Sequence, residues 1–261
     1  GFTGSVPTGA IIQKQAADKV ADVSLELGGK NPLLAYPDAD VGDVVDGALE
    51  GMNLGWQGES CGSISRLFLH ESMYEEGIDL LVEEVEQVEL GDPLDPETEM
   101  GAVTDQAQYD KSMKYIDLVQ TEGATLETGG GHAEGADLED GYFVEPTVFS
   151  DVTQDMRVAN EEVFGPVIFV MEWSDEDDLI EWANDVNYGL TASIYTDDVE
   201  TAHRTAEQLE AGYIWVNDTA THNLGAPFGG WKQSGVGREE ALDEVLAYSQ
   251  TKNVNIKFSD E

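Results

Sequence analysis

Residues 167–217 read VIFVMEWSDEDDLIEWANDVNYGLTASIYTDDVETAHRTAEQLEAGYIWVN. Short apolar runs alternate here with segments whose apolar residues recur every three or four positions. This spacing predicts strands at 167–172, 190–195 and 213–217, with helices at 176–184 and 199–210 between them. Strands that alternate with helices are typical of a mostly parallel sheet covered by helices. We therefore expect an α/β fold.

The rest of the chain continues this pattern. A helix is expected to start near Pro37-Asp38, because Val41, Val44, Val45 and Ala48 share one helical face. The alternating tail 251–258 predicts a terminal strand with one apolar face, which needs a partner sheet, for example on another subunit. Further elements are expected as a strand at 23–27, a strand at 64–69, a helix at 72–88, a helix at 106–122, a surface loop at 129–141 and a last helix at 238–248.

The charge of the chain is strongly negative. The chain has 12 Lys and Arg residues and 54 Asp and Glu residues, which gives a formal net charge of −42 over 261 residues. Phosphate contacts need clustered cations, so we expect no nucleic-acid partner. The 41% of hydrophobic residues argues against disorder. Acidic residues spread along the whole chain predict a salt-adapted protein, as in a halophile, with an ordinary acidic protein as the alternative.

The sequence also bears on where the protein works. No apolar run is long enough to cross a bilayer, so we expect no membrane partner. A single cysteine allows no intrachain disulfide, which fits a reducing compartment and a cytoplasmic protein. The chain opens in the middle of a motif, so we expect it to be part of a longer protein.

One thiol and one carboxylate are the candidate catalytic groups. Cys61 lies in GESCG (58–62), and Glu26 lies in LELGGK (25–30). A lone cysteine beside a carboxylate that activates water is a constellation for covalent catalysis. The alternatives are a buried, inert cysteine and a glutamate exposed on a strand. The four histidines do not fall at metal-ligand spacing, so we expect no metal site.

Six stretches of the chain resemble the NAD(P)-dependent aldehyde dehydrogenase superfamily, in the order of that family and over the whole chain. They are FTGSVPTG (2–9), LELGGK (25–30), GESCGSISR (58–66), EEVFGPV (161–167), NYGL (187–190) and PFGGWKQSGVGRE (227–239). The resemblance implies the C-terminal half of a family member, with a partial cofactor domain plus a catalytic domain. The implied division is a cofactor-domain remnant at 1–29, a catalytic domain at 30–236, a returning helix at 237–249 and an oligomerisation tail at 250–261.

The resemblance also implies roles for single residues. Cys61 would attack the aldehyde carbon and pass through a thioester, and Glu26 would activate the water that hydrolyses it. The other implied residues are Gly4, Ser5, Leu27, Glu162 and Phe164 for the cofactor, and Trp56, Trp215 and Phe228 for the aldehyde pocket. Glu162 would bind the nicotinamide ribose, Phe164 would pack near the nicotinamide, and Ser5 would face the pyrophosphate at a helix start.

We therefore expect oxidation of an aldehyde to a carboxylic acid with NAD or NADP, in a full-length protein that forms a homo-oligomer, either a dimer or a tetramer. A CoA-acylating semialdehyde dehydrogenase and an inactive fragment with a structural role are the alternatives. One departure bears on the nucleophile: Glu59 stands where the family usually has glutamine. A carboxylate there would raise the pKa of the Cys61 thiol by like-charge repulsion, unless it points away.

Overall fold

The computed structural model describes residues 1–135 and 138–258. Its helices are α1 (Val6–Ala17), α2 (Val41–Met52), η1 (Leu54–Trp56), α3 (Tyr74–Val85), α4 (Gln106–Glu122), α5 (Arg157–Asn160), α6 (Glu176–Asn184), α7 (Val199–Gln208) and α8 (Leu242–Ala247). Its strands are β1 (Phe2–Thr3), β2 (Leu25–Glu26), β3 (Asn31–Ala35), β4 (Ile64–His70), β5 (Thr125–Thr128), β6 (Thr147–Ser150), β7 (Val167–Trp173), β8 (Tyr188–Gly189), β9 (Thr191–Tyr195), β10 (Tyr213–Val216), β11 (Trp231–Lys232) and β12 (Gly235–Val236).

A seven-stranded sheet forms the centre of the structure, in the order β10-β9-β3-β4-β7-β6-β5. All neighbouring strands run parallel except β5 and β6, which are antiparallel. Parallel neighbours need a crossover, and helices such as α2, between β3 and β4, supply it. The expected α/β fold with a mostly parallel sheet and flanking helices is confirmed.

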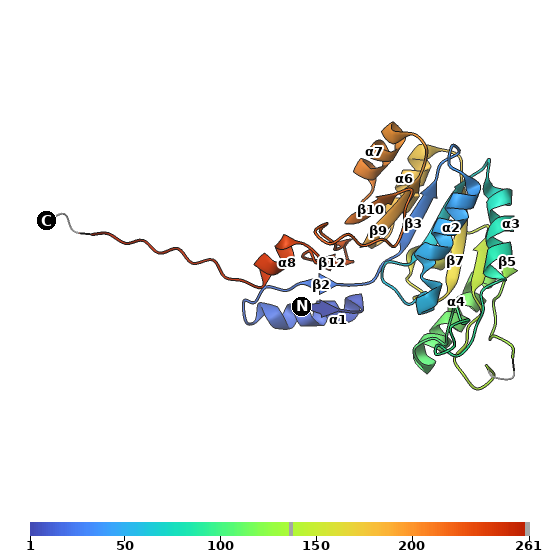
Figure 1. The fold of residues 1–261 in the computed structure, drawn as a ribbon, viewed down its shortest axis with the longest axis horizontal. Coiled ribbons are helices and arrows are strands. Elements are labelled where there is room, and N and C mark those ends of the chain that lie inside the picture. The colour runs from blue at the N-terminus through green and yellow to red at the C-terminus, as the bar shows by residue number, and fades with distance from the viewer. Residues whose placement is uncertain (136–137, 259–261) are drawn as a thin grey trace.

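Side-chain alternation along the strands divides the core into two layers. Leu33 and Leu67 pack with α2 and α3 on one face of the sheet. Leu34 and Phe68, one position further along the same strands, pack with α4 and α6 on the other face. Successive side chains of a strand point to opposite faces, so a central parallel strand must be apolar on both. Figure 1 shows α2 and α3 lying over one face of the sheet.

The sequence pattern did not predict strand β3, although it lies at the centre of the sheet. Pro32 obscures the pattern, because proline cannot donate a hydrogen bond to a neighbouring strand. The register between β3 and β4 shifts between Asn31 and Pro32, and this irregularity accommodates the proline. The signal for the strand was the apolar run that follows, of which Leu33 and Leu34 are fully buried.

A second, three-stranded sheet in the order β1-β2-β12 lies beside the large one and carries α1 along it. Strand β2 is its middle strand, parallel to β1 and antiparallel to β12. Glu26 pairs with Gly235 in this sheet, although the two are far apart in the sequence. In Figure 1 this sheet, α1 and α8 lie on the same side of the large sheet, and the tail extends beyond them.

The C-terminal part differs from expectation. The last helix covers only Leu242–Ala247, because Glu240 adopts a left-handed φ of 63° that no α-helix allows, and Glu239 forms a bridge with Phe228. Residues 251–258 form no strand among the described residues, since the alternating segment has no partner there. Residues 136–137 of the expected 129–141 loop and 259–261 of the expected tail lie outside the described residues. No helix among the described residues is long and apolar enough to cross a membrane.

Candidate active site

Three sequence motifs meet at the amino ends of central strands of the large sheet. The LELGGK segment (25–30) runs directly into β3, the GESCGS segment (58–63) into β4, and EEVFGP (161–166) into β7. These strands are parallel neighbours in the order β3-β4-β7, so their amino ends lie side by side. The site is therefore built where three neighbouring strands begin.

Hydrogen bonds fix the segment of Cys61 to the segment of Glu26. The Asn31 side-chain amide donates to the carbonyl oxygens of Cys61 (2.8 Å) and Ser63 (2.9 Å). A Cβ on Gly29 would lie 2.2 Å from the Cys61 carbonyl oxygen, so only glycine allows this approach. Asn31 was not singled out from the sequence. Its signal is a polar residue that opens an apolar strand, and the structure buries it.

Glu162 lies on the other side of the same glycine pair. The Gly29 backbone N–H donates to Glu162 Oε1 at 2.7 Å. A Cβ on Gly28 would lie only 2.4 Å from Glu162 Oε2. The backbone of Gly28 and Gly29 thus lies between the Cys61 segment and this carboxylate, and at Gly29 the Cys61 carbonyl oxygen leaves no room for a Cβ.

The Glu26 carboxyl is buried and lacks hydrogen-bond partners among the described residues. Burial raises its pKa to about 8; next in size come an increase from Glu239, an opposing effect from Arg238 and a further increase from Glu240. Desolvation disfavours the charged form of a carboxyl group, which is the dominant cause here. A group with a pKa near the working pH suits a general base.

Cys61 is half-buried, and its pKa is raised to about 11. Burial is the largest cause, followed by the negative charges of Glu26 and Glu162. The backbone N–H groups of Cys61 and Gly62 act in the opposite direction. The thiol is therefore protonated at neutral pH in the structure as it stands, and a thiolate requires a positive charge or a proton acceptor nearby.

Glu59 points away from Cys61. Both of its carboxylate oxygens accept a hydrogen bond from the Thr104 backbone N–H, at 3.0 and 3.2 Å. Glu26 and Glu162, rather than Glu59, are the carboxylates that raise the pKa of Cys61. Glu59 thus ties the nucleophile segment to the loop before α4.

Three of the residues expected to bind the cofactor lie around β2 and the start of α1. The Gly4 backbone N–H donates to the carbonyl oxygen of Glu26 at 3.0 Å, and Leu27 packs against Gly9 of α1. Ser5 precedes α1, but its side chain makes no capping hydrogen bond. The first N–H groups of the helix are therefore not bonded to the Ser5 side chain. Free N–H groups at a helix start suit a phosphate group, and this end of the chain fits a dinucleotide.

The other two expected cofactor residues, Glu162 and Phe164, flank Val163, which is bonded to α4, a helix that the sequence did not connect with the site. Phe164 adopts a left-handed φ of 60°, which is uncommon for a bulky residue and typical of functional turns. Gln108 of α4 donates to the carbonyl oxygen of Val163 at 3.2 Å. The positive charge of Lys111, also on α4, opposes the rise in the pKa of Glu162 that burial causes.

The structure brings two of the three expected aldehyde-pocket residues together. Trp215 and Phe228 are both buried, and the Tyr213 ring lies 4.9 and 5.6 Å from theirs. Gly229, directly after Phe228, covers Glu26: a Cβ there would lie 3.0 Å from Glu26 Oε1.

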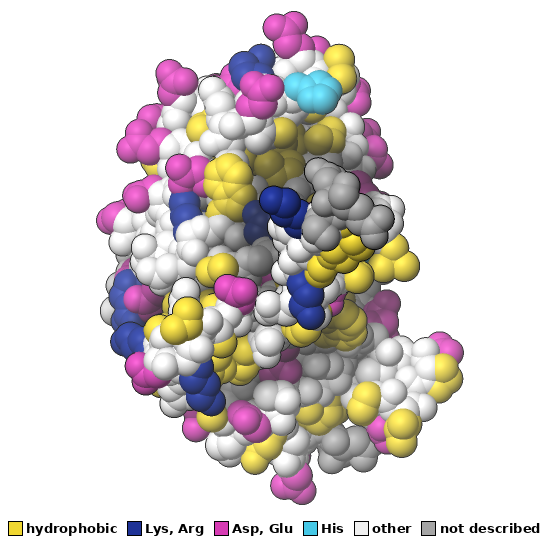
Figure 2. Space-filling model, turned by 90° about the vertical axis from the view of Figure 1, so that its left-hand side faces the viewer, with side chains coloured by type: hydrophobic (Ala, Val, Ile, Leu, Met, Phe, Trp, Pro, Cys, Tyr) yellow, Lys and Arg dark blue, Asp and Glu magenta, His cyan; other side chains and the backbone are white. Residues whose placement is uncertain are grey.

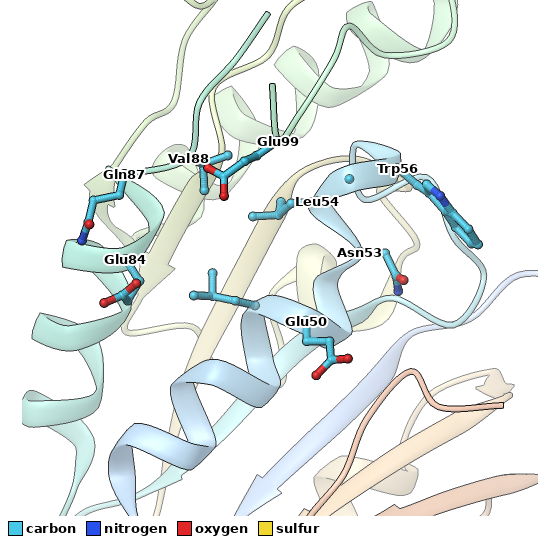
Figure 3. A pocket seen from close by; sticks show the side chains of 10 residues that line it. Glu50, Asn53, Leu54, Trp56, Glu84, Gln87, Val88 and Glu99 are labelled. Carbon is cyan, nitrogen blue, oxygen red and sulfur yellow. The ribbon is translucent and has the colours of Figure 1, made fainter. Parts of the chain in front are cut away.

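Trp56 lies elsewhere, 66% exposed at a cavity of about 580 Å³ between α2 and α3. Figure 3 shows its ring turned away from the other labelled side chains of that cavity. The residues that line this cavity include neither Cys61 nor Glu26. A role for Trp56 at the aldehyde stays a prediction. The described residues hold no group of three or more His, Cys, Asp or Glu that suits a metal ion.

The fold and the site define an α/β protein in which a half-buried cysteine, the buried Glu26 and the partly buried Glu162 lie where three parallel strands begin. Residues 1–254 match the aldehyde dehydrogenase family. The chain therefore belongs to the aldehyde dehydrogenase family.

Among its relatives, the aldehyde dehydrogenase tropH of Talaromyces stipitatus is 49% identical over 98% of this chain and 50% of its own length. A betaine aldehyde dehydrogenase of Brucella anthropi is 44% identical, over 98% of this chain and 53% of its own. The structure of an NAD+ complex of an aldehyde dehydrogenase from Bacillus cereus matches with a TM-score of 0.93 and 43% identity, over 98% of this chain and 52% of that one. The chain thus spans about half the length of the curated relatives it matches.

Proposed function

We propose that the protein oxidises an aldehyde to a carboxylic acid with NAD or NADP, through a thioester on Cys61. The observation that carries this proposal is the wedge of Gly28 and Gly29 between Cys61 and Glu162, directly after Glu26. In this proposal Cys61 is the nucleophile, Glu26 the base and Glu162 the carboxylate for a ribose, and their closeness to one short segment supports these roles. Membership of the aldehyde dehydrogenase family supports the same reaction.

The cofactor would be held by Gly4, Ser5 and Leu27 at α1 and by Glu162 and Phe164 near β7. The oxidised nicotinamide, when bound, supplies the acceptor for the hydride that the aldehyde carbon loses. The other chemistry belongs to this chain. The Cys61 thiol releases its proton to solvent water, Sγ bonds to the carbonyl carbon as the C=O π bond opens, and the N–H groups of Cys61 and Gly62 stabilise the negative charge on the carbonyl oxygen.

Glu26 completes the turnover. Its carboxylate takes a proton from a water molecule, whose oxygen then attacks the thioester carbon, and the Cys61 sulfur leaves with the acid released. The free carboxylate oxygens of Glu26, without partners among the described residues, are available for that water. A base in this position favours hydrolysis over transfer to CoA.

Intact-mass spectrometry of the full-length enzyme, quenched during turnover, tests this reaction. The wild type is expected to carry little adduct, whereas E26Q accumulates an acyl group on Cys61 because acylation proceeds and hydrolysis does not. C61A is expected to carry no adduct and to oxidise nothing. E75Q is the control for E26Q, since Glu75 is exposed in the first turn of α3. An unmodified E26Q enzyme, or an active C61A enzyme, contradicts the proposal, and acid formed without CoA excludes the acylating alternative.

The assembly of the protein is part of the proposal. The chain corresponds to the C-terminal half of a family member, as the order of its motifs supports, and the full-length protein forms a dimer or a tetramer. Val254, Ile256 and Phe258 are 69%, 70% and 82% exposed on the extended tail, which supports a role as a strand that pairs with a second copy. Removing residues 250–261 from the full-length protein is expected to lower its mass in light scattering. An unchanged mass contradicts this role.

We also place the protein in the cytoplasm of a salt-adapted cell. The net charge of −42 supports this, and Figure 2 shows Asp and Glu side chains spread around the face it views rather than gathered in one patch. Salt screens the repulsion among such charges. The midpoint of thermal unfolding is therefore expected to rise with KCl concentration into the molar range. A midpoint that is independent of salt contradicts the assignment.

A further inference from the structure

Four aromatic rings form a continuous wall around Phe228. The His222 and Phe228 ring centroids are 4.8 Å apart, and those of Tyr213 and Phe228 are 5.6 Å apart. Tyr213 also stacks on His222 at 6.2 Å and lies 4.9 Å from Trp215. The indole N–H of Trp215 donates to the carbonyl oxygen of Thr221 at 2.8 Å, which fixes the segment that carries His222.

This aromatic wall is connected directly to the proposed base. Phe228 and Glu239 exchange two backbone hydrogen bonds, of 3.0 and 2.7 Å. Gly229 follows Phe228, and a Cβ on it would lie 3.0 Å from Glu26 Oε1. One glycine therefore separates the wall from the carboxyl group at which the reaction is completed. The backbone that carries Phe228 thus lies next to the Glu26 carboxyl group.

His222 is the exposed ring of the four. Its Nδ1 is 2.8 Å from Glu240 Oε1, and Nε2 makes no hydrogen bond with any described residue. The Glu240 backbone N–H donates to Glu244 Oε2 at 2.9 Å, which fixes the backbone of the residue that holds the imidazole. With Nδ1 occupied, Nε2 accepts a hydrogen bond when the ring is neutral and donates one when it is protonated.

We propose that His222 is a specificity-determining residue that selects aromatic aldehydes with a ring hydroxyl group. This inference rests on the proposed oxidation of aldehydes. A planar ring packs on the aromatic wall, and a hydroxyl group both donates and accepts, so it pairs with Nε2 in either protonation state. The carboxyl groups of Glu26, Glu239 and Glu240 disfavour an anionic aldehyde in the same place. A quaternary ammonium aldehyde, such as betaine aldehyde, offers Nε2 no hydrogen bond at all.

The test compares three benzaldehydes with the full-length enzyme: para-hydroxy, para-methoxy and para-methyl. The hydroxyl substituent donates and accepts, the methoxy group only accepts, and the methyl group does neither. The wild type is expected to prefer the hydroxyl over the methyl compound by about tenfold in kcat/KM, as one partly exposed hydrogen bond allows. In H222F, which keeps the ring contact with Phe228, this preference is expected to fall below about twofold. H203Q, on an exposed histidine of α7, is the control that keeps it.

The outcomes separate this inference from the proposed function. An enzyme that oxidises none of the three compounds, nor any other aldehyde, contradicts the proposed function. Equal kcat/KM values for the three compounds in the wild type overturn the role of His222, while the oxidation itself stands. A higher kcat/KM for betaine aldehyde than for all three also overturns it. The wild-type series requires no variant, so it can overturn the role of His222 even if H222F folds poorly.

Discussion

Replacement of Glu26 by glutamine is expected to stabilise the protein at alkaline pH while it abolishes turnover. The carboxyl group is buried without a partner among the described residues, and folding raises its pKa from 4.5 to about 8. The folded state therefore binds the Glu26 proton more tightly than the unfolded state does. This contribution to stability is complete below the unfolded pKa and is lost as the pH rises through the folded pKa.

The magnitude follows from the two pKa values. Complete ionisation of Glu26 in the folded protein costs about 5 kcal/mol relative to the unfolded chain, as an upper value. Glutamine is neutral at every pH and has no such cost. The advantage of E26Q in the free energy of unfolding is thus expected to grow by about 2–3 kcal/mol between about pH 6 and about pH 9.

Urea unfolding of the full-length protein at the two pH values, at constant high salt, measures this difference. E75Q provides the matched control, because Glu75 is exposed and its replacement is expected to give curves parallel to the wild type. Curves for E26Q that also run parallel to the wild type between the two pH values refute the reasoning. In that case the Glu26 carboxyl is ionised in the folded protein at neutral pH.

Two further variants test the geometry of the site. G29A places a Cβ 2.2 Å from the Cys61 carbonyl oxygen, so we expect a loss of about 1–3 kcal/mol in urea unfolding and about a hundredfold loss of kcat. G55A, whose nearest neighbour would be 3.7 Å away, is the control, and equal effects of the two would contradict the packing argument. E59Q is expected to change kcat near neutral pH by less than about twofold, because the Glu59 carboxylate is bonded to Thr104 and not directed at the thiol. A clear acidic shift of its pH–rate profile would show that Glu59 does repel the thiolate.

The fold class was predictable because strand and helix periods are local properties of the sequence. The alternation in 167–217 predicts β7, α6, β9, α7 and β10 to within a few residues. Strand β3 was not predicted because Pro32 breaks the local pattern. Only pairing with β4 on one side and β9 on the other makes the segment a central strand. The late start of α8 at Leu242 was not predicted, because the left-handed backbone conformation of Glu240 decides it and no periodicity in the sequence records that conformation.

The site was predictable in part for the same reason. Cys61 and Glu26 carry chemical types that stand out in a sequence, and their motifs carry the family resemblance. Which groups face them depends on strand order. The direction of Glu59 follows from the position of the Thr104 backbone, and the support of the 161–166 segment by Gln108 follows from the packing of α4. Neither contact leaves a trace in the local sequence.

The three segments of the proposed catalytic centre lead directly into β3, β4 and β7. The centre can therefore form only when these strands pair in their native register. In a chain in which β4 has not yet paired with its neighbours, the thiol and carboxyl groups are present but are not held close to one another. Recovery of acylation during refolding should therefore appear in one step, together with the protection of the amides in these strands from hydrogen exchange.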